Sequence, residues 1–349
     1  MAEPKNAVLI GLGMVSGTHL AALADLRDSV RLYGVLGRSP ERLSSFLAKA
    51  SEFGITPRTY HDVAEIAADG TVDLAIIVTP PNARLAFVEP LSQAGIPILM
   101  EKPVERTTEA AERMVALCES RGVPLGIVFQ LRMRAAAQKL ASVLAEDGLG
   151  EIGLVEISVP WWRDQAYYDE PGRGTYQRDG GGVLISQAIH TLDLALSLAG
   201  PVRQVQAMAR RTAFHKMESE DFVAAGLDFE SGAVGSLVAS TATYPGGPES
   251  ITLHGTLGSA VMVSGKVTLT MRSGAVEEFG EDAGTGGGAD PMAFTHGWHR
   301  DIIADFAAAI DEGRPPLVTG REALRVHALI DALILSSRTG QTQPVAKEG

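Results

Sequence analysis

The residues with the clearest capacity for chemistry lie in one stretch, Asp179–Asp193, which opens with three consecutive glycines after the aspartate. If the stretch continues as a helix, Ser186, His190 and Asp193 share one face, because positions three and four apart are neighbours. A histidine exchanges protons near neutral pH, so His190 is a candidate general acid or base. Asp193 is a candidate to orient it or to bind a substrate hydroxyl. The alternative is a core histidine hydrogen-bonded by Asp193 one turn away.

A second candidate is Lys102, in the sequence Glu101-Lys102-Pro103 that follows the apolar run 96–100. The proline restricts the backbone of Lys102 to an extended conformation, which aims its side chain. An ammonium group stabilises a developing alkoxide and can lose a proton when it is desolvated. His190 is therefore a candidate acid/base, and Lys102 is a candidate electrostatic and proton-relay group. The exchange of these two roles is an open alternative.

The N-terminal residues have the pattern of a dinucleotide-binding unit. An apolar run at 6–10 precedes Gly11-Leu-Gly13, and a helical pattern follows, with Ser16 at the third small position. Small residues let the backbone approach a pyrophosphate, and amide groups at the helix start face the phosphates. A purely structural turn is the alternative. The cofactor contacts predicted here are Gly11, Gly13, Met14 and Val15.

The next predicted strand, 32–36, ends at Gly37, where an NAD-preferring site places Asp or Glu. Arg38 can pair with a 2′-phosphate, and Ser39 can donate a hydrogen bond to it. These residues favour NADP over NAD as the cofactor. Ser39 before Pro40 also has the pattern of a helix N-cap, and both roles can hold at once.

A continuous apolar run at 73–78 indicates a buried parallel strand. Doubly wound sheets bind ligands at the carboxyl ends of their strands. The segment 79–82 stands at that end of this strand, as Glu101-Lys102 does after the run 96–100. The further cofactor contacts predicted on this basis are Thr79, Pro80, Asn82, Glu101 and Lys102.

Aromatic residues cluster before the three glycines, in a chain with only 5% aromatics. Aromatic faces pack against sugar C–H surfaces, while arginine and tyrosine bind hydroxyls or carboxylates. Loop packing against a sheet edge is the alternative for each of them. His299, further along the chain, is expected to be a packing residue at a helix start rather than a cleft residue. The predicted substrate contacts are Trp161, Arg163, Tyr176, Ser186, Gln187, His190, Asp193 and Lys102.

Length and composition set the class of protein. The 349 residues suffice for two domains, and 45% hydrophobic with 21% charged residues is typical of a soluble globular protein. A net charge of −12 argues against nucleic acid and against an anionic membrane surface as partners. The single cysteine, Cys118, has the pattern of a core residue and excludes an intrachain disulfide. The histidines lack metal-ligand spacing and no signal peptide is evident, so we expect no metal and a cytoplasmic protein.

The glycine turn, the segment 79–82, Glu101-Lys102-Pro103 and the stretch 180–193 occur in that order. Together with the closing segment 305–337 they resemble the Gfo/Idh/MocA family, over nearly the whole chain. This is the glucose–fructose oxidoreductase / inositol dehydrogenase / rhizopine catabolism family. The resemblance implies an α/β fold with an N-terminal Rossmann domain and its doubly wound parallel sheet, placed at 1–128. A C-terminal α/β domain with a large, mostly antiparallel open sheet would occupy 129–349, its last helix packing back on the body.

The resemblance also implies an NAD(P)-dependent dehydrogenase or reductase acting on CH–OH groups of a sugar, inositol or related polyol. Lys102 and His190 would meet at the reacting carbon, and the protein would be a homodimer or homotetramer. Ser186 stands where many members have Asp, and Arg84 where many have His. Which sugar is used, and in which direction, is not determined by the sequence. Two alternatives stay open: transient oxidation by a tightly held cofactor in a net isomerisation or glycoside cleavage, and a non-catalytic nucleotide-sensing regulator.

Overall fold

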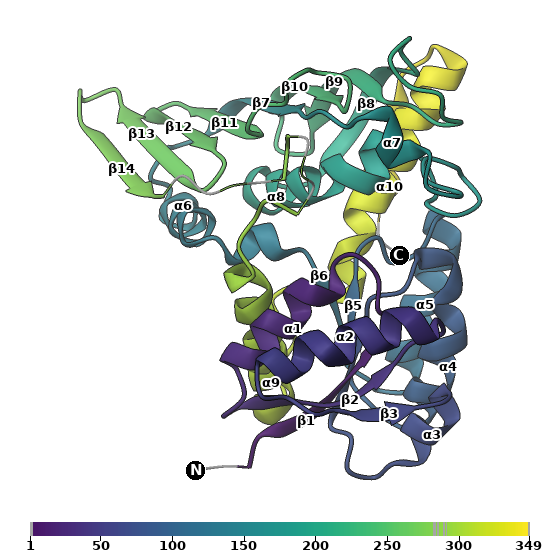
Figure 1. The fold of residues 1–349 in the computed structure, drawn as a ribbon. Helices are drawn as coiled ribbons and strands as arrows, with labels where there is room; N and C mark the ends of the chain where they lie inside the picture. The colour runs from purple at the N-terminus through teal and green to yellow at the C-terminus, as the bar shows by residue number, and fades with distance from the viewer. Residues whose placement is uncertain (1–2, 282–283, 285, 289, 291, 348–349) are drawn as a thin grey trace. The chain divides into compact units, whose positions relative to one another are not determined.

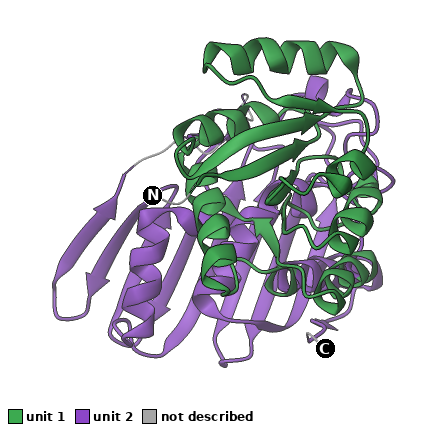
Figure 2. Ribbon diagram, turned by 90° about the horizontal axis from the view of Figure 1, so that it is seen from below, with its two compact units in different colours: residues 1–105, 109–130, 296–323 green, residues 106–108, 131–295, 324–349 purple. Residues whose placement is uncertain are grey.

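The computed structural model describes residues 3–281, 284, 286–288, 290 and 292–347 (Figure 1). Contacts divide the chain into two compact units, which Figure 2 distinguishes by colour. The first unit comprises residues 1–105, 109–130 and 296–323, and the second comprises 106–108, 131–295 and 324–349. This division differs from the expected split after residue 128, because residues 296–323 return to the first unit.

Six parallel strands form the sheet of the first unit, in the order β3-β2-β1-β4-β5-β6. This is the strand order of a dinucleotide-binding Rossmann fold, so the predicted fold of this part is confirmed. Its strands are β1 (Lys5–Ile10), β2 (Val30–Leu36), β3 (Arg58–Tyr60), β4 (Leu74–Ile77), β5 (Ile98–Glu101) and β6 (Leu125–Val128). Its helices are α1 (Ser16–Asp25), α2 (Pro40–Glu52), α3 (Val63–Ala68), the short 3₁₀ turn η1 (Pro81–Ala83), α4 (Leu85–Gln93), α5 (Thr108–Ser120) and α9 (Gly297–Glu312).

The apolar strands of this unit form its core, and their carboxyl ends carry the predicted functional residues. Strands β4, β5 and β6 are buried along their whole length, as strands covered on both faces must be. Cys118 on α5 is fully buried, which confirms it as a core residue, and burial raises the pKa of its thiol to about 11. Because the strands are parallel, the residues that follow β1, β4 and β5 lie at the same edge of the sheet. That edge carries the glycine turn, Thr79 and Lys102.

Helix α9 joins the first unit although it follows most of the second unit in the chain. It packs beside α1 and against β6. A Cβ on Gly126 of β6 would lie 2.7 Å from Cδ2 of Phe306, which is almost fully buried on α9. Glycine at this position therefore allows the close approach of the helix to the sheet.

Nine strands form the sheet of the second unit, in the order β14-β13-β12-β11-β7-β10-β9-β8-β15. Only the pairing of β7 with β10 is parallel among these neighbours, so the predicted mostly antiparallel sheet is confirmed. The strands are β7 (Ile152–Pro160), β8 (Val202–Arg210), β9 (Phe222–Phe229), β10 (Val234–Ser240), β11 (Ser250–Gly255), β12 (Gly258–Val263), β13 (Lys266–Met271), β14 (Val276–Gly280) and β15 (Gln343–Pro344). The helices are η2 (Gln130–Met133), α6 (Ala135–Ala145), α7 (Gln165–Tyr168), the π-helical turn η3 (Leu184–Ala188), α8 (Ile189–Ala199) and α10 (Gly320–Thr339).

Helices pack on this second sheet. Helix α8 contacts β7 and β11, and α6 contacts β13 and β14. The last helix is tied to β8, since the hydroxyls of Ser336 and Ser337 accept hydrogen bonds from the amides of Ala207 and Ala209 at 2.9 and 2.7 Å. Among the helices that the structure describes, none is long and apolar enough to cross a membrane.

The last of the three glycines before η3, Gly182, is explained by the close approach of Glu220. The carbonyl oxygen of Glu220 accepts a hydrogen bond from Val183 N at 2.9 Å, and its carboxylate accepts from Gly182 N and Leu184 N at 3.2 Å each. A Cβ on Gly182 would lie only 1.8 Å from that carbonyl oxygen. Glu220 thus satisfies amide groups at the helix start that have no partner inside the helix.

We expect Gly182→Ala to lower the free energy of unfolding by about 3 kcal/mol, because the backbone of Glu220 must move to admit a methyl group. Gly153→Ala is the matched control, since a Cβ there meets nothing within 4 Å. Its change should stay within about 0.5 kcal/mol. Urea denaturation of both variants measures the difference, and equal stability of the two would contradict the close-approach explanation.

Candidate active site

The turn after β1 is shaped to receive a dinucleotide phosphate. Gly11 has a φ of +99°, and a Cβ there would lie 2.8 Å from Thr79 Cγ2 and 2.9 Å from Thr79 N. A Cβ on Gly13 would meet nothing within 4 Å, so the backbone of Gly13 is open to an approaching group. Ser16 donates a hydrogen bond from its hydroxyl to Gly13 O at 2.7 Å, which closes the turn onto α1. Met14 is exposed and Val15 half-buried at the helix start, where amides favour phosphate.

The end of β4 offers polar groups at the same edge. Thr79 Oγ1 is buried and has no hydrogen-bond partner among the residues that the structure describes. Pro80 and Asn82, on the following turn, are exposed. A buried hydroxyl without a partner and an exposed amide fit the polar edge of a bound nicotinamide nucleotide.

The end of β2 holds the residues predicted to distinguish NADP from NAD. The Ser39 hydroxyl accepts a hydrogen bond from Arg42 N at 3.2 Å and donates one to Glu41 at 2.7 Å. The helix-cap role of Ser39 at the start of α2 is therefore confirmed. Arg38 is exposed beside it. Contact of either residue with a cofactor stays a prediction.

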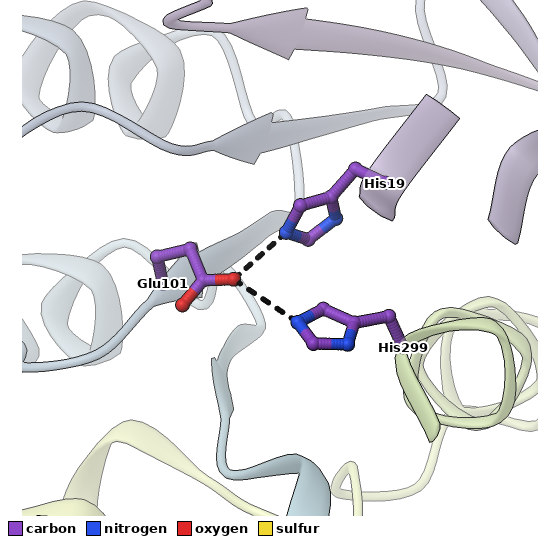
Figure 3. Close-up of side chains that lie close together, drawn as sticks. All are labelled: His19, Glu101 and His299. Atoms are coloured by element: carbon purple, nitrogen blue, oxygen red, sulfur yellow. Dashed lines mark hydrogen bonds and ion pairs between the residues drawn. The ribbon is translucent and has the colours of Figure 1, made fainter. Parts of the chain in front are cut away.

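A buried carboxylate lies at the end of β5. Glu101 is only 6% exposed, and its Oε1 lies 2.8 Å from His19 Nε2 on α1 and 3.5 Å from His299 Nε2 on α9 (Figure 3). Burial works against ionisation of Glu101, but the hydrogen bonds from the two histidines outweigh it and hold the pKa of this carboxyl well below its ordinary value of 4.5. The carboxylate is therefore engaged by two histidines of the first unit, and the predicted contact of Glu101 with the cofactor stays a prediction. His299 is buried at the start of α9, as the packing interpretation expected.

These three residues also bring potential metal ligands together. One ligand atom of each lies within 4.8 Å of the others. Hydrogen bonding already accounts for the short His19–Glu101 contact. The buried guanidinium of Arg84 acts electrostatically on the same carboxylate, and a further positive charge would be repelled by it. Burial also lowers the pKa of His299, with the Glu101 hydrogen bond opposing the shift, which favours a neutral ring.

Lys102 stands next to Glu101 and is half-buried. The carbonyl oxygens on both sides of its α-carbon accept hydrogen bonds from Arg84, which is 2% exposed. The peptide bond from Lys102 to Pro103 is cis. The main chain of Lys102 is thus held at the edge of the sheet that carries the glycine turn.

In the second unit, η3 interrupts the regular helical period expected for the stretch 180–200. A π-helical turn runs from Leu184 to Ala188, and α8 begins directly after it. Such a turn contains one more residue than an α-helical turn, and it is frequent at functional sites. Ser186 and His190 are half-buried around this turn. The shared face predicted for Ser186, His190 and Asp193 stays a prediction, with Ser186 on η3 and the other two on α8.

Asp193 is 2% exposed and is held by Arg132. Arg132 Nε and Nη2 donate to its two carboxylate oxygens at 2.8 and 2.7 Å, as a bidentate pair does. Both oxygens of Asp193 therefore have a donor from η2. The roles predicted for Asp193, as a partner of His190 or of substrate, stay predictions within this constraint.

A polar cluster lies beside the π turn. Gln187 is buried, and its Nε2 donates to the hydroxyl of Tyr167 at 3.2 Å. Arg173 Nη1 donates to the same hydroxyl at 3.0 Å and its guanidinium stacks 4.3 Å over the ring of Tyr167. Gln187 Oε1 has no hydrogen-bond partner among the described residues. The amide oxygen is therefore available to a hydroxyl donor.

The predicted aromatic contacts differ in their surroundings. Trp161 is 6% and Arg163 3% exposed, and Arg163 donates to the carbonyl oxygens of Trp162, Gly286 and Gly288. These bonds use the guanidinium to hold a loop, which favours the loop-packing alternative for both residues over substrate contact. Tyr176 is 38% exposed. It stays available for a ligand.

The sequence did not predict the structural roles of His19, Arg132 and Glu220. Each acts on a residue far away in the chain, at separations of 82, 61 and 36–38 residues. No local pattern marks such pairs. A histidine one turn into α1 and an arginine in a short 3₁₀ turn are ordinary residues until the fold places their partners.

We expect Glu101→Gln to lower the free energy of unfolding at neutral pH by about 1–3 kcal/mol, because charge-assisted hydrogen bonds are lost. The pKa of Glu101 in the folded protein lies below the ordinary 4.5, so its stabilisation is complete above pH 4.5 and is lost as the pH falls through the folded value. The stability difference between wild type and variant should therefore shrink in acid. Urea denaturation at neutral and acidic pH measures it, with exposed Glu52→Gln as control. A difference independent of pH would count against the ionised carboxylate.

Two protein-family models match this chain, one in the N-terminal part and one in the C-terminal part. The family model described as an oxidoreductase family with an NAD-binding Rossmann fold matches residues 5–129. The model described as the GFO/IDH/MocA C-terminal domain matches residues 137–261. The D-apiose dehydrogenase of Rhizobium rhizogenes is 27% identical over 98% of this chain and 97% of that protein. The scyllo-inositol 2-dehydrogenase (NADP(+)) of Bacillus subtilis is 23% identical over 96% of this chain and 94% of that protein.

A solved structure of a dehydrogenase is also similar to this chain. The WlbA dehydrogenase from Bordetella pertussis, in complex with NADH and UDP-GlcNAcA, matches with a TM-score of 0.83 and 28% identity, over 99% of each chain. The named relatives are dehydrogenases acting on sugars and polyols. Since the two family models together span most of the sequence, this chain belongs to the Gfo/Idh/MocA family of NAD-binding oxidoreductases.

Proposed function

We propose that the protein transfers a hydride between NAD(P) and a hydroxyl or carbonyl carbon of a sugar, inositol or related polyol. The observation that carries the proposal is the main-chain anchoring of Lys102 at the strand edge that also holds the open glycine turn. An ammonium group anchored beside a dinucleotide cradle is suited to act on the oxygen of a reacting carbon.

We assign separate roles in the reaction to His190 and Lys102. When bound, the nicotinamide supplies the hydride acceptor or donor. His190 removes the hydroxyl proton during oxidation, or returns it during reduction, because an imidazole exchanges protons near neutral pH. Lys102 stabilises the negative charge that develops on the same oxygen. Lys102 belongs to the first unit and His190 to the second, so their meeting at the substrate is part of the proposal.

Residues around His190 supply orientation and substrate contacts. Asp193 lies one turn after His190 on α8 and is held in place by Arg132. Its role is to bind a substrate hydroxyl or to support the imidazole of His190. Gln187 Oε1 and the half-buried Ser186 offer acceptor and donor groups to further hydroxyls. Tyr176 contributes an exposed aromatic face. A sugar or polyol presents the hydroxyls and C–H surfaces that such a set recognises.

The substrate class follows from relatives. One is named for oxidation of D-apiose, another for scyllo-inositol, and the bacterial WlbA enzyme was solved with UDP-GlcNAcA. All of these ligands carry neighbouring hydroxyls. We assign a polyhydroxylated ring or open-chain sugar on this ground.

Assembly into a dimer or tetramer is proposed through the outer face of the second sheet. Apolar side chains on β7, β8, β10, β12 and β14 share this face by the pairing register and are 38–60% exposed. Exposed apolar patches of this kind commonly mark protein interfaces. The residues are Leu154, Met208, Val234, Val238, Val261 and Val276.

Replacing Lys102 with Ala and His190 with Asn should each reduce turnover by about 100-fold or more, because one removes charge stabilisation and the other the proton acceptor. The measurement is absorbance of the reduced nicotinamide with a panel that includes D-apiose, scyllo-inositol, D-xylose and levoglucosan. Binding of NADPH, followed by fluorescence, should persist in both variants. Near wild-type turnover in either variant would contradict the catalytic role assigned to that residue.

We also propose NADP as the favoured cofactor, since β2 ends without a carboxylate at Gly37 and Arg38 is exposed beside it. Arg38→Ala should weaken NADPH binding by about 10- to 100-fold, the loss expected for hydrogen bonds to a charged phosphate. Binding of NADH should change little. Arg42→Ala, an exposed arginine on the first turn of α2, is the matched control. Equal affinity of wild type for both nucleotides would overturn the preference.

A further inference from the structure

Arg84 lies in a cage of main-chain carbonyl oxygens. Its Nε donates to Thr79 O at 3.0 Å, and its Nη1 donates to Glu101 O and Pro103 O. Its Nη2 lies 3.4 Å from Lys102 O. The side chain is among the largest that are fully buried in the chain. Every nitrogen of the guanidinium is therefore directed at backbone rather than at solvent.

Three of the four carbonyls in the cage belong to Lys102 and its two neighbours in the chain. Glu101, Lys102 and Pro103 are consecutive, so Arg84 binds the carbonyl before Lys102, its own carbonyl and the one after it. These carbonyls stand at or beyond the carboxyl end of β5, where the sheet offers no further partner. The fourth carbonyl, of Thr79, follows β4. Arg84 thus ties the ends of two neighbouring strands to each other and sets the backbone from which Lys102 projects.

The positive charge of Arg84 is stabilised by nearby carboxylates. Burial lowers the pKa of Arg84 to about 10, while the carboxylates of Glu101 and Glu105 oppose the shift. Glu105 is 6% exposed, and Glu101 is held ionised by His19 and His299. The guanidinium therefore carries its charge at neutral pH and is compensated by two buried carboxylates.

We propose that Arg84 is a positioning residue for Lys102, which locks the Glu101-Lys102-Pro103 backbone to the end of β4 and so aims the ammonium at the reacting oxygen. The proposal rests on the function assigned above to Lys102. It does not make Arg84 a catalytic residue, because the guanidinium is enclosed by carbonyls. A planar fork with donors in several fixed directions is needed here, and neither lysine nor histidine supplies one.

The test compares Arg84→Lys and Arg84→His with wild type. Lysine keeps the charge with a single ammonium, and histidine replaces the guanidinium with a ring that has only two nitrogens, so the pair tests loss of geometry in two ways. Amine labelling with acetic anhydride, read by peptide mass spectrometry, reports how Lys102 is held without requiring a substrate. Exposed Lys49 in the same unit is the internal reference. Labelling of Lys102 relative to Lys49 should rise in both variants.

Arg134→Lys is the matched control. Arg134 is also 2% exposed and donates to Glu249 at 2.8 Å and Ser264 O at 2.6 Å in the second unit. It should lower thermal stability without changing the relative labelling of Lys102. A general loss of stability is thereby separated from a local loss of positioning.

Kinetics provide the second measurement, with the panel substrate that wild type turns over fastest. The kcat of the Arg84 variants should fall about 10- to 100-fold, as expected for misplacement of a reacting group by roughly 1 Å. The NADPH dissociation constant should change little. Unchanged labelling and unchanged kcat in a folded Arg84 variant would overturn the positioning role. Retained turnover in Lys102→Ala would instead overturn the assigned function, while the labelling result would still decide whether Arg84 holds Lys102.

Discussion

An ionised carboxylate buried in the first unit has to be compensated, and that requirement connects segments that are distant in the chain. Glu101 ends β5, His19 lies on α1 and His299 on α9, and all three meet within hydrogen-bonding range or close to it. An isolated buried charge costs several kcal/mol, and the histidines on α1 and α9 compensate this carboxylate where it is buried. The same carboxylate balances Arg84 on its other side. The packing of α9 and the buried guanidinium that holds the Lys102 backbone are therefore both linked to the charge of Glu101.

The second unit uses buried charges in a similar way around α8. The Glu220 carboxylate caps the helix start, and Arg132 grips Asp193 one turn after His190. Burial raises the pKa of Glu220, while the bonds from Leu184 and Gly182 oppose the shift. The helix that carries His190 is thus held from its start and from its side. Its polar groups are positioned by residues that never need to contact a substrate.

Much of the architecture follows from local pattern. The glycine turn, the buried strand at β4 and the N-cap at Ser39 are each specified by neighbours within a few residues, so sequence alone identifies them. The π turn could not be predicted, because the sequence of Leu184–Ala188 has the pattern of an ordinary amphipathic helix. Arg132, His19 and the return of α9 were also missed. Their partners lie far away in sequence, and no single-sequence pattern encodes the pairing.

The return of residues 296–323 to the first unit has a consequence for biosynthesis. A chain emerging from the ribosome presents β1 to β6 early, yet α9 is made only after strands β7 to β14 of the second sheet. During that interval Gly126 and the neighbouring face of α1 lack their cover, and Glu101 lacks one of its two histidines. The nucleotide-binding sheet consequently reaches its final packing only after α9, at residues 297–312, has been made. Vectorial folding from the N-terminus, common for independent domains, is thereby replaced by late closure of the first unit.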